Sequence, residues 1–378
     1  MKKSLFALAV LGAFAGAAQA QSSVTLYGTL DMAVGTTSNT SATTGASFTG
    51  LYNSGMENSA WGLKGSEDMG GGLKTHFNLE SAFTPSTGQA NGSQGDASVN
   101  GNANGELFGR AANVGIAGGF GDVTVGRMLN PYIIAAFGGQ SIYSNNFMVT
   151  SLVAGSGGGF GNINFFVNNA IKYDLPKFAD ISITAFYALG NSTSSSAGTT
   201  TVLSAEWSNS GFTLGGAYQK LNAGTGTSVG STGNSPVGTL VGALQPDETD
   251  YQFFAKYATG PFSIGANFLN SNASASVSGL GFVGSQNLII ASAGYQATPA
   301  LNIALGYSTV SSSSKVDLLA KYALSKRTYL YAQVDSVNNS SSAAAAGSLG
   351  YSNYWDGTTP SSGAVNSTGF AAGVVTHF

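Results

Sequence analysis

Residues 61–80 read WGLKGSEDMGGGLKTHFNLE, and this stretch decides the fold. Apolar and polar side chains alternate on both sides of three consecutive glycines, Gly70 to Gly72. Alternation with a period of two is typical of a β-strand with one apolar and one polar face, and the glycines favour a tight turn between two such strands. The stretch therefore predicts an antiparallel hairpin.

The same unit recurs along the chain from Ser23 to Phe378. About ten alternating residues are followed by a connection, and short connections such as 69–72 and 118–121 alternate with long polar ones such as 84–106. All eight prolines, which cannot donate to a β-ladder, fall in the expected connections. This pattern predicts an all-β fold, a transmembrane antiparallel β-barrel of about sixteen strands with both ends on the short-turn side.

The composition is poor in charge and rich in glycine. Charged residues make up 8% of the chain, against about 25% in an average soluble domain, and there are 54 glycines. Cysteine is absent, which excludes a disulfide framework and thiol chemistry. The net charge of −3 offers no basic surface for nucleic acid. The sequence contains no zinc-like Cys or His spacing and no phosphate-binding loop, so we expect neither a metal nor a cofactor.

Residues 1–20 are predicted to be a signal peptide. The chain begins with Met1, Lys2 and Lys3, continues with an apolar run, and reaches a small-residue cleavage motif that ends at Ala20. Cleavage there would leave residues 21–378 as one barrel domain. Later apolar runs are all well below the roughly 20 residues of a spanning helix. Export leaves a secreted protein and an outer-membrane barrel as alternatives.

A long connection without charge stands out in the middle of the chain. Between Arg127 and Lys172 lie 44 residues without Asp, Glu, Lys or Arg. Connections of this length are usually functional or disordered. Aromatic and branched side chains at its centre, Tyr132, Ile133 and Phe137, predict that it packs against another part of the protein. We expect residues of about 128–159 to fold back into the barrel and narrow the lumen.

Several stretches carry a resemblance to a known family, in the family's order. They are Ser23–Gly28, Trp61–Lys74, Leu107–Arg110, Gly121–Arg127, Lys172–Asp174, Tyr322–Thr328 and the terminal Phe378. The segments are similar to those of the general trimeric porins of Gram-negative outer membranes. The resemblance implies a sixteen-stranded homotrimeric barrel in outer-membrane lipid and lipopolysaccharide that passes small hydrophilic solutes. It also implies that the third external loop folds inward as a constriction.

The charges expected at the constriction depart from the family's pattern. In the family, acids on the inward loop usually face basic residues on the wall, and the matching motifs put Lys64 and Arg127 on that wall. The loop here has no acid. Phe166 stands where a basic residue is often found. An uncharged loop facing one or two cations makes only a weak transverse field, so we expect weak ion selectivity with a slight anion preference.

Alternation assigns further side chains to the lumen. The residues expected to line the pore or its constriction are Lys64, Lys74, Arg127, Tyr132, Ile133, Phe137 and Lys321. Further charges expected to face inward are Asp31, Glu80, Glu206, Lys256, Asp317 and Asp335. Most of these can equally be ordinary wet side chains of a polar wall. Phe378 is expected in the aromatic girdle, as a membrane and assembly signal, and Tyr329 and Tyr331 near strand ends or facing outward.

Other functions remain as alternatives. Apolar contacts from the loop suit a porin that prefers neutral sugars or aromatic solutes. An outer-membrane hydrolase would have only His76 and His377 as general bases, so we do not expect an enzyme. A secreted adhesin would need short sandwich-like strands. The acids at 247, 248 and 250 are expected to be a solvated loop cluster, with divalent-cation binding as the alternative.

Overall fold

The computed structural model describes ten stretches of the chain. They are residues 23–38, 47–53, 55–89, 107–142, 165–190, 198–222, 247–273, 285–310, 313–338 and 366–378. The predicted signal peptide, residues 1–20, lies outside them, as does the part of the expected constriction loop from 143 to 159. No helix in the described stretches is long and apolar enough to cross a membrane.

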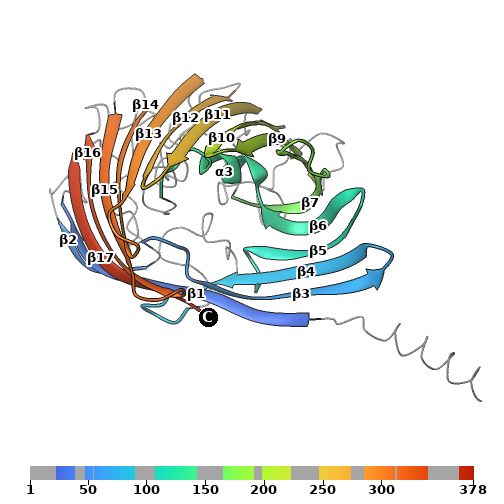
Figure 1. The fold of residues 1–378 in the computed structure, drawn as a ribbon, viewed down its shortest axis with the longest axis horizontal. Coiled ribbons are helices and arrows are strands. Elements are labelled where there is room, and N and C mark those ends of the chain that lie inside the picture. Colours follow the sequence, from blue (N-terminus) through green and yellow to red (C-terminus); the bar gives the residue numbers. More distant parts are fainter. Residues whose placement is uncertain are drawn as a thin grey trace, which may run out of the picture.

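Seventeen β-strands follow one another around a ring (Figure 1). They are β1 (Ser23–Thr37), β2 (Phe48–Asn53), β3 (Ala60–Gly70), β4 (Leu73–Ala82), β5 (Ala111–Gly118), β6 (Gly121–Leu129), β7 (Phe166–Asp174), β8 (Ile181–Ala188), β9 (Thr200–Asn209), β10 (Phe212–Leu221), β11 (Glu248–Thr259), β12 (Phe262–Ala273), β13 (Ser285–Gln296), β14 (Leu301–Val310), β15 (Ser313–Ala323), β16 (Thr328–Asn338) and β17 (Ser367–His377). From β3 to β17 each strand pairs antiparallel with the next, and β1 pairs with β17. The ring is therefore closed.

Two of the strands share one position in the wall. β2 pairs with residues 32–37 of β1, and β3 pairs with residues 23–29 of the same strand. The seventeen segments therefore fill sixteen positions, and the prediction of a closed antiparallel barrel of about sixteen strands is confirmed. The break between β2 and β3 is stabilised by Asp31. Its carboxylate accepts hydrogen bonds from the backbone N–H groups of Met56 and Glu57 at 2.6 and 2.8 Å.

The two faces of the wall differ as the alternation predicts. Along β13, Leu288 and Ile290 point inward and are buried, whereas Ile289 points outward and is exposed. Phe253 and Ile264 on the outer face are likewise more than half exposed. Because water does not favour so much exposed apolar surface, this outer face suits the hydrocarbon of a membrane, and closure leaves no unpaired strand edge there.

Within the described stretches, a short helix lies inside the ring. α3 (Pro131–Ala136) follows β6 directly and contacts β9, β10 and β11 from within (Figure 1). Asn130 caps the helix, since its side-chain oxygen accepts the backbone N–H of Tyr132 at 2.9 Å. Pro131 occupies the first helical position, where its missing N–H costs nothing. Residues 137–142 continue along the inner face toward β13, where Ser141 contacts Ser292.

Candidate functional site

Side-chain amides bind Asn130, at the start or root of the inward segment (residues 130–142), to the barrel wall. The Nδ2 group of Asn130 donates to Oε1 of Gln219 on β10 at 2.6 Å. The Nε2 group of Gln219 in turn donates to Oδ2 of Asp250 on β11 at 2.9 Å. All three side chains are buried. The same Asn130 side chain therefore starts the helix and fastens it to two neighbouring strands.

Three other wall side chains donate to backbone carbonyl oxygens of the inward segment. The pairs are Gln252 Nε2 to Tyr132 O at 2.5 Å, Asn267 Nδ2 to Ala136 O at 3.1 Å, and Ser292 Oγ to Gly139 O at 3.2 Å. The donors come from β11, β12 and β13 in turn. Residues 130–142 thus cross the inner face of four successive strands.

The side chains of α3 divide into a buried and an open face. Tyr132 and Ile133 are at most 1% exposed, and Phe137 packs against the same buried cluster while staying partly open. Ile134 is 55% exposed, and because α3 packs on β9, β10 and β11, this residue lies on the side of the helix away from the wall. The expectation that Tyr132 and Ile133 contact solutes is therefore corrected. Burial, with the carboxylates of Asp250 and Glu248 nearby, raises the pKa of Tyr132 well above its usual range.

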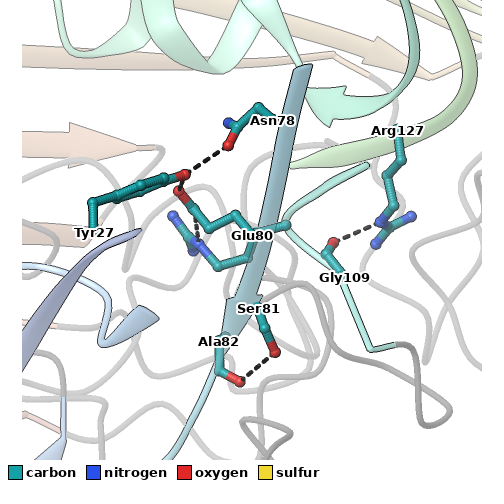
Figure 2. A network of polar contacts seen from close by, with 8 residues as sticks. Tyr27, Asn78, Glu80, Ser81, Ala82, Gly109 and Arg127 are labelled. Carbon is teal, nitrogen blue, oxygen red and sulfur yellow. Dashed lines mark hydrogen bonds and ion pairs between the residues drawn. The ribbon is translucent and has the colours of Figure 1, made fainter. Parts of the chain in front are cut away.

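A polar network covers the wall of β1, β4 and the start of β5 (Figure 2). The hydroxyl oxygen of Tyr27 lies 2.7 Å from a carboxylate oxygen of Glu80 and 2.7 Å from the side-chain oxygen of Asn78, and its one proton can bond to either. The guanidinium Nε of Arg110 lies 2.5 Å from the other oxygen of Glu80. The Lys64 ammonium lies 4.8 Å from the centre of the Tyr27 ring, a cation–π contact. Lys64 and Glu80 thus both contact Tyr27 and lie on the same face of the wall.

Arg110 was not predicted as a site residue. Its guanidinium binds Glu80 and also lies 4.9 Å from the ring of Phe166, which begins β7. The resemblance had included this arginine in the stretch 107–110, and that was the available signal. The position of Arg110 in the sequence did not show which way its side chain points, because it lies at the end of a long connection, where no alternation assigns a face. Its backbone N–H bonds to the carbonyl of Glu80, which brings both side chains to the same side.

Arg127 reaches the same region through an irregularity of β6. The register of β6 against β7 shifts between Gly126 and Met128, and Gly126 has a φ of +129°, which favours glycine. The guanidinium donates from Nε to the Gly109 carbonyl at 2.5 Å and from Nη1 to Asn168 at 2.6 Å. Arg127 is thereby fastened beside Arg110, and its orientation is fixed.

The inward segment and Lys64 on β3 lie on opposite sides of the barrel. α3 packs on β9, β10 and β11, which lie about halfway around the ring from β1 and β3. The two sites also lie at a similar depth along the barrel axis. Lys64 lies six residues from Gly70, where β3 ends, and Gln252 lies seven from Thr259, where β11 ends. The uncharged segment therefore lies opposite Lys64 at a similar distance from the short turns, whereas Arg127 on β6 lies close to the start of the segment, about a quarter of the ring from β10.

The model of the Gram-negative porin family matches residues 7–342 of this sequence. The chain belongs to the Gram-negative porins. Its place is therefore the outer membrane. It is 39% identical over 198 residues to outer membrane porin protein 32 of Delftia acidovorans, covering 50% of each chain. It is 35% identical over 187 residues to an outer membrane porin protein of Bordetella pertussis, covering 46% of this chain and 43% of that one. The aligned region spans about half the length of these two relatives.

Solved structures agree with the fold of this porin. The anion-selective porin from Comamonas acidovorans superimposes with a TM-score of 0.71 at 24% identity, over 95% of this chain and all of that one. The outer-membrane expressed OmpT of Vibrio cholerae superimposes with a TM-score of 0.62 at 16% identity, over 94% and 98% of the two chains. Both similarities concern the barrel as a whole.

Lys321 and Lys74 lie near the short-turn ends of their strands. The Lys321 ammonium is 3.7 Å from the centre of the Tyr329 ring, close to the end of β15. Tyr329 itself is buried and donates to Glu57. Lys74 is the second residue of β4, beside the glycine turn. Tyr329 is the second residue of β16, near a strand end as predicted, and its side chain faces inward.

The acids at 247–250 do not form a solvated loop cluster. Glu248 and Asp250 are buried on the inner face of β11, where Glu248 accepts a hydrogen bond from Ser271 at 2.5 Å. Only Asp247 is exposed. The described stretches contain no group of three or more His, Cys, Asp or Glu side chains suited to a metal ion. The cluster was misassigned because β11 begins at Glu248, and residues 248 and 250 both fall on its inward face.

A second buried charge group lies on β15 and β16. Asp317 and Asp335 face inward, as expected, and are at most 1% exposed. The Lys315 ammonium lies between them, 2.9 Å from an oxygen of Asp317 and 3.7 Å from one of Asp335. Each histidine is also paired with a carboxylate, His76 with Asp122 at 2.9 Å and His377 with Glu57 at 2.8 Å.

Proposed function

We propose that this porin is a passive diffusion channel for small hydrophilic solutes. Its narrowest cross-section lies between α3 and the wall that carries Lys64, Arg110 and Arg127. The observation that carries the proposal is the position of α3 inside the ring, about halfway around from Lys64 on β3. A closed barrel with a segment across its lumen selects solutes first by size.

We further propose a modest preference for anions. Glu80 neutralises Arg110, which leaves the positive charges of Lys64 and Arg127 at this level. The opposing segment carries no charge, so the field across the lumen stays small. The name of the porin from Comamonas acidovorans, anion-selective, supports the sign of this preference. A preference for aromatic solutes is not proposed, because Tyr132 and Ile133 are buried.

Liposome swelling tests the channel, and reversal potentials test its selectivity. We expect neutral sugars to enter liposomes at rates that fall with size, and asymmetric KCl to give a small reversal potential of the sign for anions. Absence of swelling with the smallest sugars contradicts the channel proposal. A strongly cation-selective potential contradicts the charge assignment alone.

We also infer a homotrimer in contact with outer-membrane lipid and lipopolysaccharide, exported by cleavage after Ala20. The family supports all three inferences, and the apolar outer face supports the contact with lipid. An unheated gel sample that migrates as a trimer and separates on boiling tests the assembly. N-terminal sequencing of the outer-membrane protein tests cleavage, with Gln21 as the expected first residue.

A further inference from the structure

Side chains of the barrel wall make the hydrogen bonds that hold the inward segment in place. Gln252, Asn267 and Ser292 donate to carbonyl oxygens of the segment, and Gln219 accepts from Asn130 at its root. Buried amides and hydroxyls on four adjacent strands are costly unless they are paired. The inward segment provides hydrogen-bond partners for these side chains on β10, β11, β12 and β13.

Glycine allows the closest approach between the segment and the wall. Gly265 on β12 has no side chain, and a methyl group built there would overlap the carbonyl oxygen of Gly139. A methyl group at Gly139 would overlap the side chain of Asn267 and the carbonyl oxygen of Ala266. At this point two backbones therefore touch directly, and any other residue at 265 must push the segment toward the lumen.

The hydrogen bonds at the root have a fixed direction. The N–H of Tyr132 donates to Asn130, Asn130 donates to Gln219, and Gln219 donates to Asp250. Asn130 accepts from the helix and donates to Gln219 on β10, and Gln219 donates to Asp250 on β11, so the chain of donors requires an acceptor at its end. The carboxylate of Asp250 provides that acceptor, which explains a buried acid on a wall that otherwise faces an uncharged segment.

We propose that Gln219, Gln252, Gly265, Asn267 and Ser292 form a loop seat that sets the position of residues 130–142. They are positioning residues, since they act through the segment and not on the solute. The seat fixes how far α3 stands from the opposite wall. This inference rests on the proposed function wherever it concerns the width of the channel, but the position of the segment can be measured independently.

Spin labels measure the position of the segment directly. The chain has no cysteine, so Ile134→Cys on α3 and Leu26→Cys on the outer face of β1 can be labelled selectively. Gly265→Ala is expected to shift the distance between these labels to shorter values, because the added methyl pushes the segment across the lumen. Ala266→Val adds bulk on the outer face of the same strand and is the matched control, with an unchanged distance.

Channel recordings on the same variants separate the two proposals. With Gly265→Ala we expect a loss of single-channel conductance of more than about one-tenth, since a narrower bore carries less current. An unchanged label distance overturns the seat. A shorter distance with unchanged conductance leaves the seat intact and overturns the constriction at α3.

A second variant keeps the test decisive if Gly265→Ala does not assemble. Asn267→Ala removes the donor to Ala136 and adds no bulk near Gly139, and we expect a broader label distance distribution and noisier open-channel current. Gln286→Ala is its control, because Gln286 is also buried on the inner face but makes no hydrogen bond to residues 130–142 in the described part of the chain. Equal behaviour of these two variants overturns the seat.

Discussion

The hydroxyl of Tyr331 on β16 donates a 2.8 Å hydrogen bond to the carboxylate of Asp31 on β1, 300 residues away. β17 runs between these two strands, so the bond spans the seam where the barrel closes. Asp31 also accepts the two N–H groups that hold the break between β2 and β3. One buried carboxylate therefore serves both the closure of the ring and the course of residues 55–59.

Asp31→Ala should destabilise the barrel strongly. It leaves two backbone N–H groups and one hydroxyl buried without an acceptor, at about 1–3 kcal/mol for each group. The temperature at which the folded form disappears on gels should fall. Tyr331→Phe removes only one of these bonds and should lower it much less. Equal effects of the two changes would contradict the central role of Asp31.

Lys64→Gln and Arg127→Gln should each reduce the anion preference. Each change removes a positive charge at the level of α3, and rings of charge select ions by sign. Reversal potentials in asymmetric KCl measure the effect. Lys177→Gln, in the exposed connection between β7 and β8, removes the same charge elsewhere and should leave the potential unchanged. A similar shift in all three variants would assign the selectivity to overall charge.

Glu80→Gln should increase the anion preference, because Arg110 then loses the carboxylate that neutralises it. Tyr27 keeps Asn78 as an acceptor, so the local structure should hold. Adding Arg110→Gln to this variant should return the reversal potential close to the original value. The gain should shrink from 0.1 M to 1 M salt, as the screening length falls from about 10 Å to about 3 Å. A potential that does not respond to Glu80→Gln places the pair outside the ion path.

Removal of Phe378 should lower the yield of assembled barrel more than Phe378→Ala does. The backbone N–H and carbonyl of Phe378 pair with those of Gly28 at 3.0 and 3.1 Å, and the ring lies against Gly28, where a side chain would overlap it. The alanine variant keeps the backbone pair and loses only the ring. Heat-modifiable gel shifts of refolded protein measure the yield. A full yield without Phe378 would contradict its predicted role in assembly.

The barrel was predictable because its signal is local. Alternation around Gly70–Gly72 predicts the hairpin that β3 and β4 form, and the glycines adopt positive φ in the turn. Exclusion of proline from strands holds for every proline in the described stretches. Each strand must show the lipid one face and the lumen the other, and that requirement is written into neighbouring residues.

The site was predictable only in part, because it depends on register between distant strands. Glu80 and Arg110 meet because β4 and β5 pair there, which no periodicity within either strand indicates. Tyr132 and Ile133 were expected to face solutes, and a helix of six residues is too short for its buried face to be recognised from sequence. Tyr331 was expected near a strand end or facing outward, but it is buried inside, bonded to Asp31.

The wall side chains on β11, β12 and β13 bind the inward segment through its carbonyl oxygens, which every amino acid possesses. Substitutions at Ile134 can therefore accumulate without loosening the attachment, provided that the backbone keeps its course. Because the attachment uses the backbone and the exposed face uses side chains, permeability can change during evolution while the attachment is kept. The same separation also makes the open face of α3 a convenient place to install a new filter by engineering.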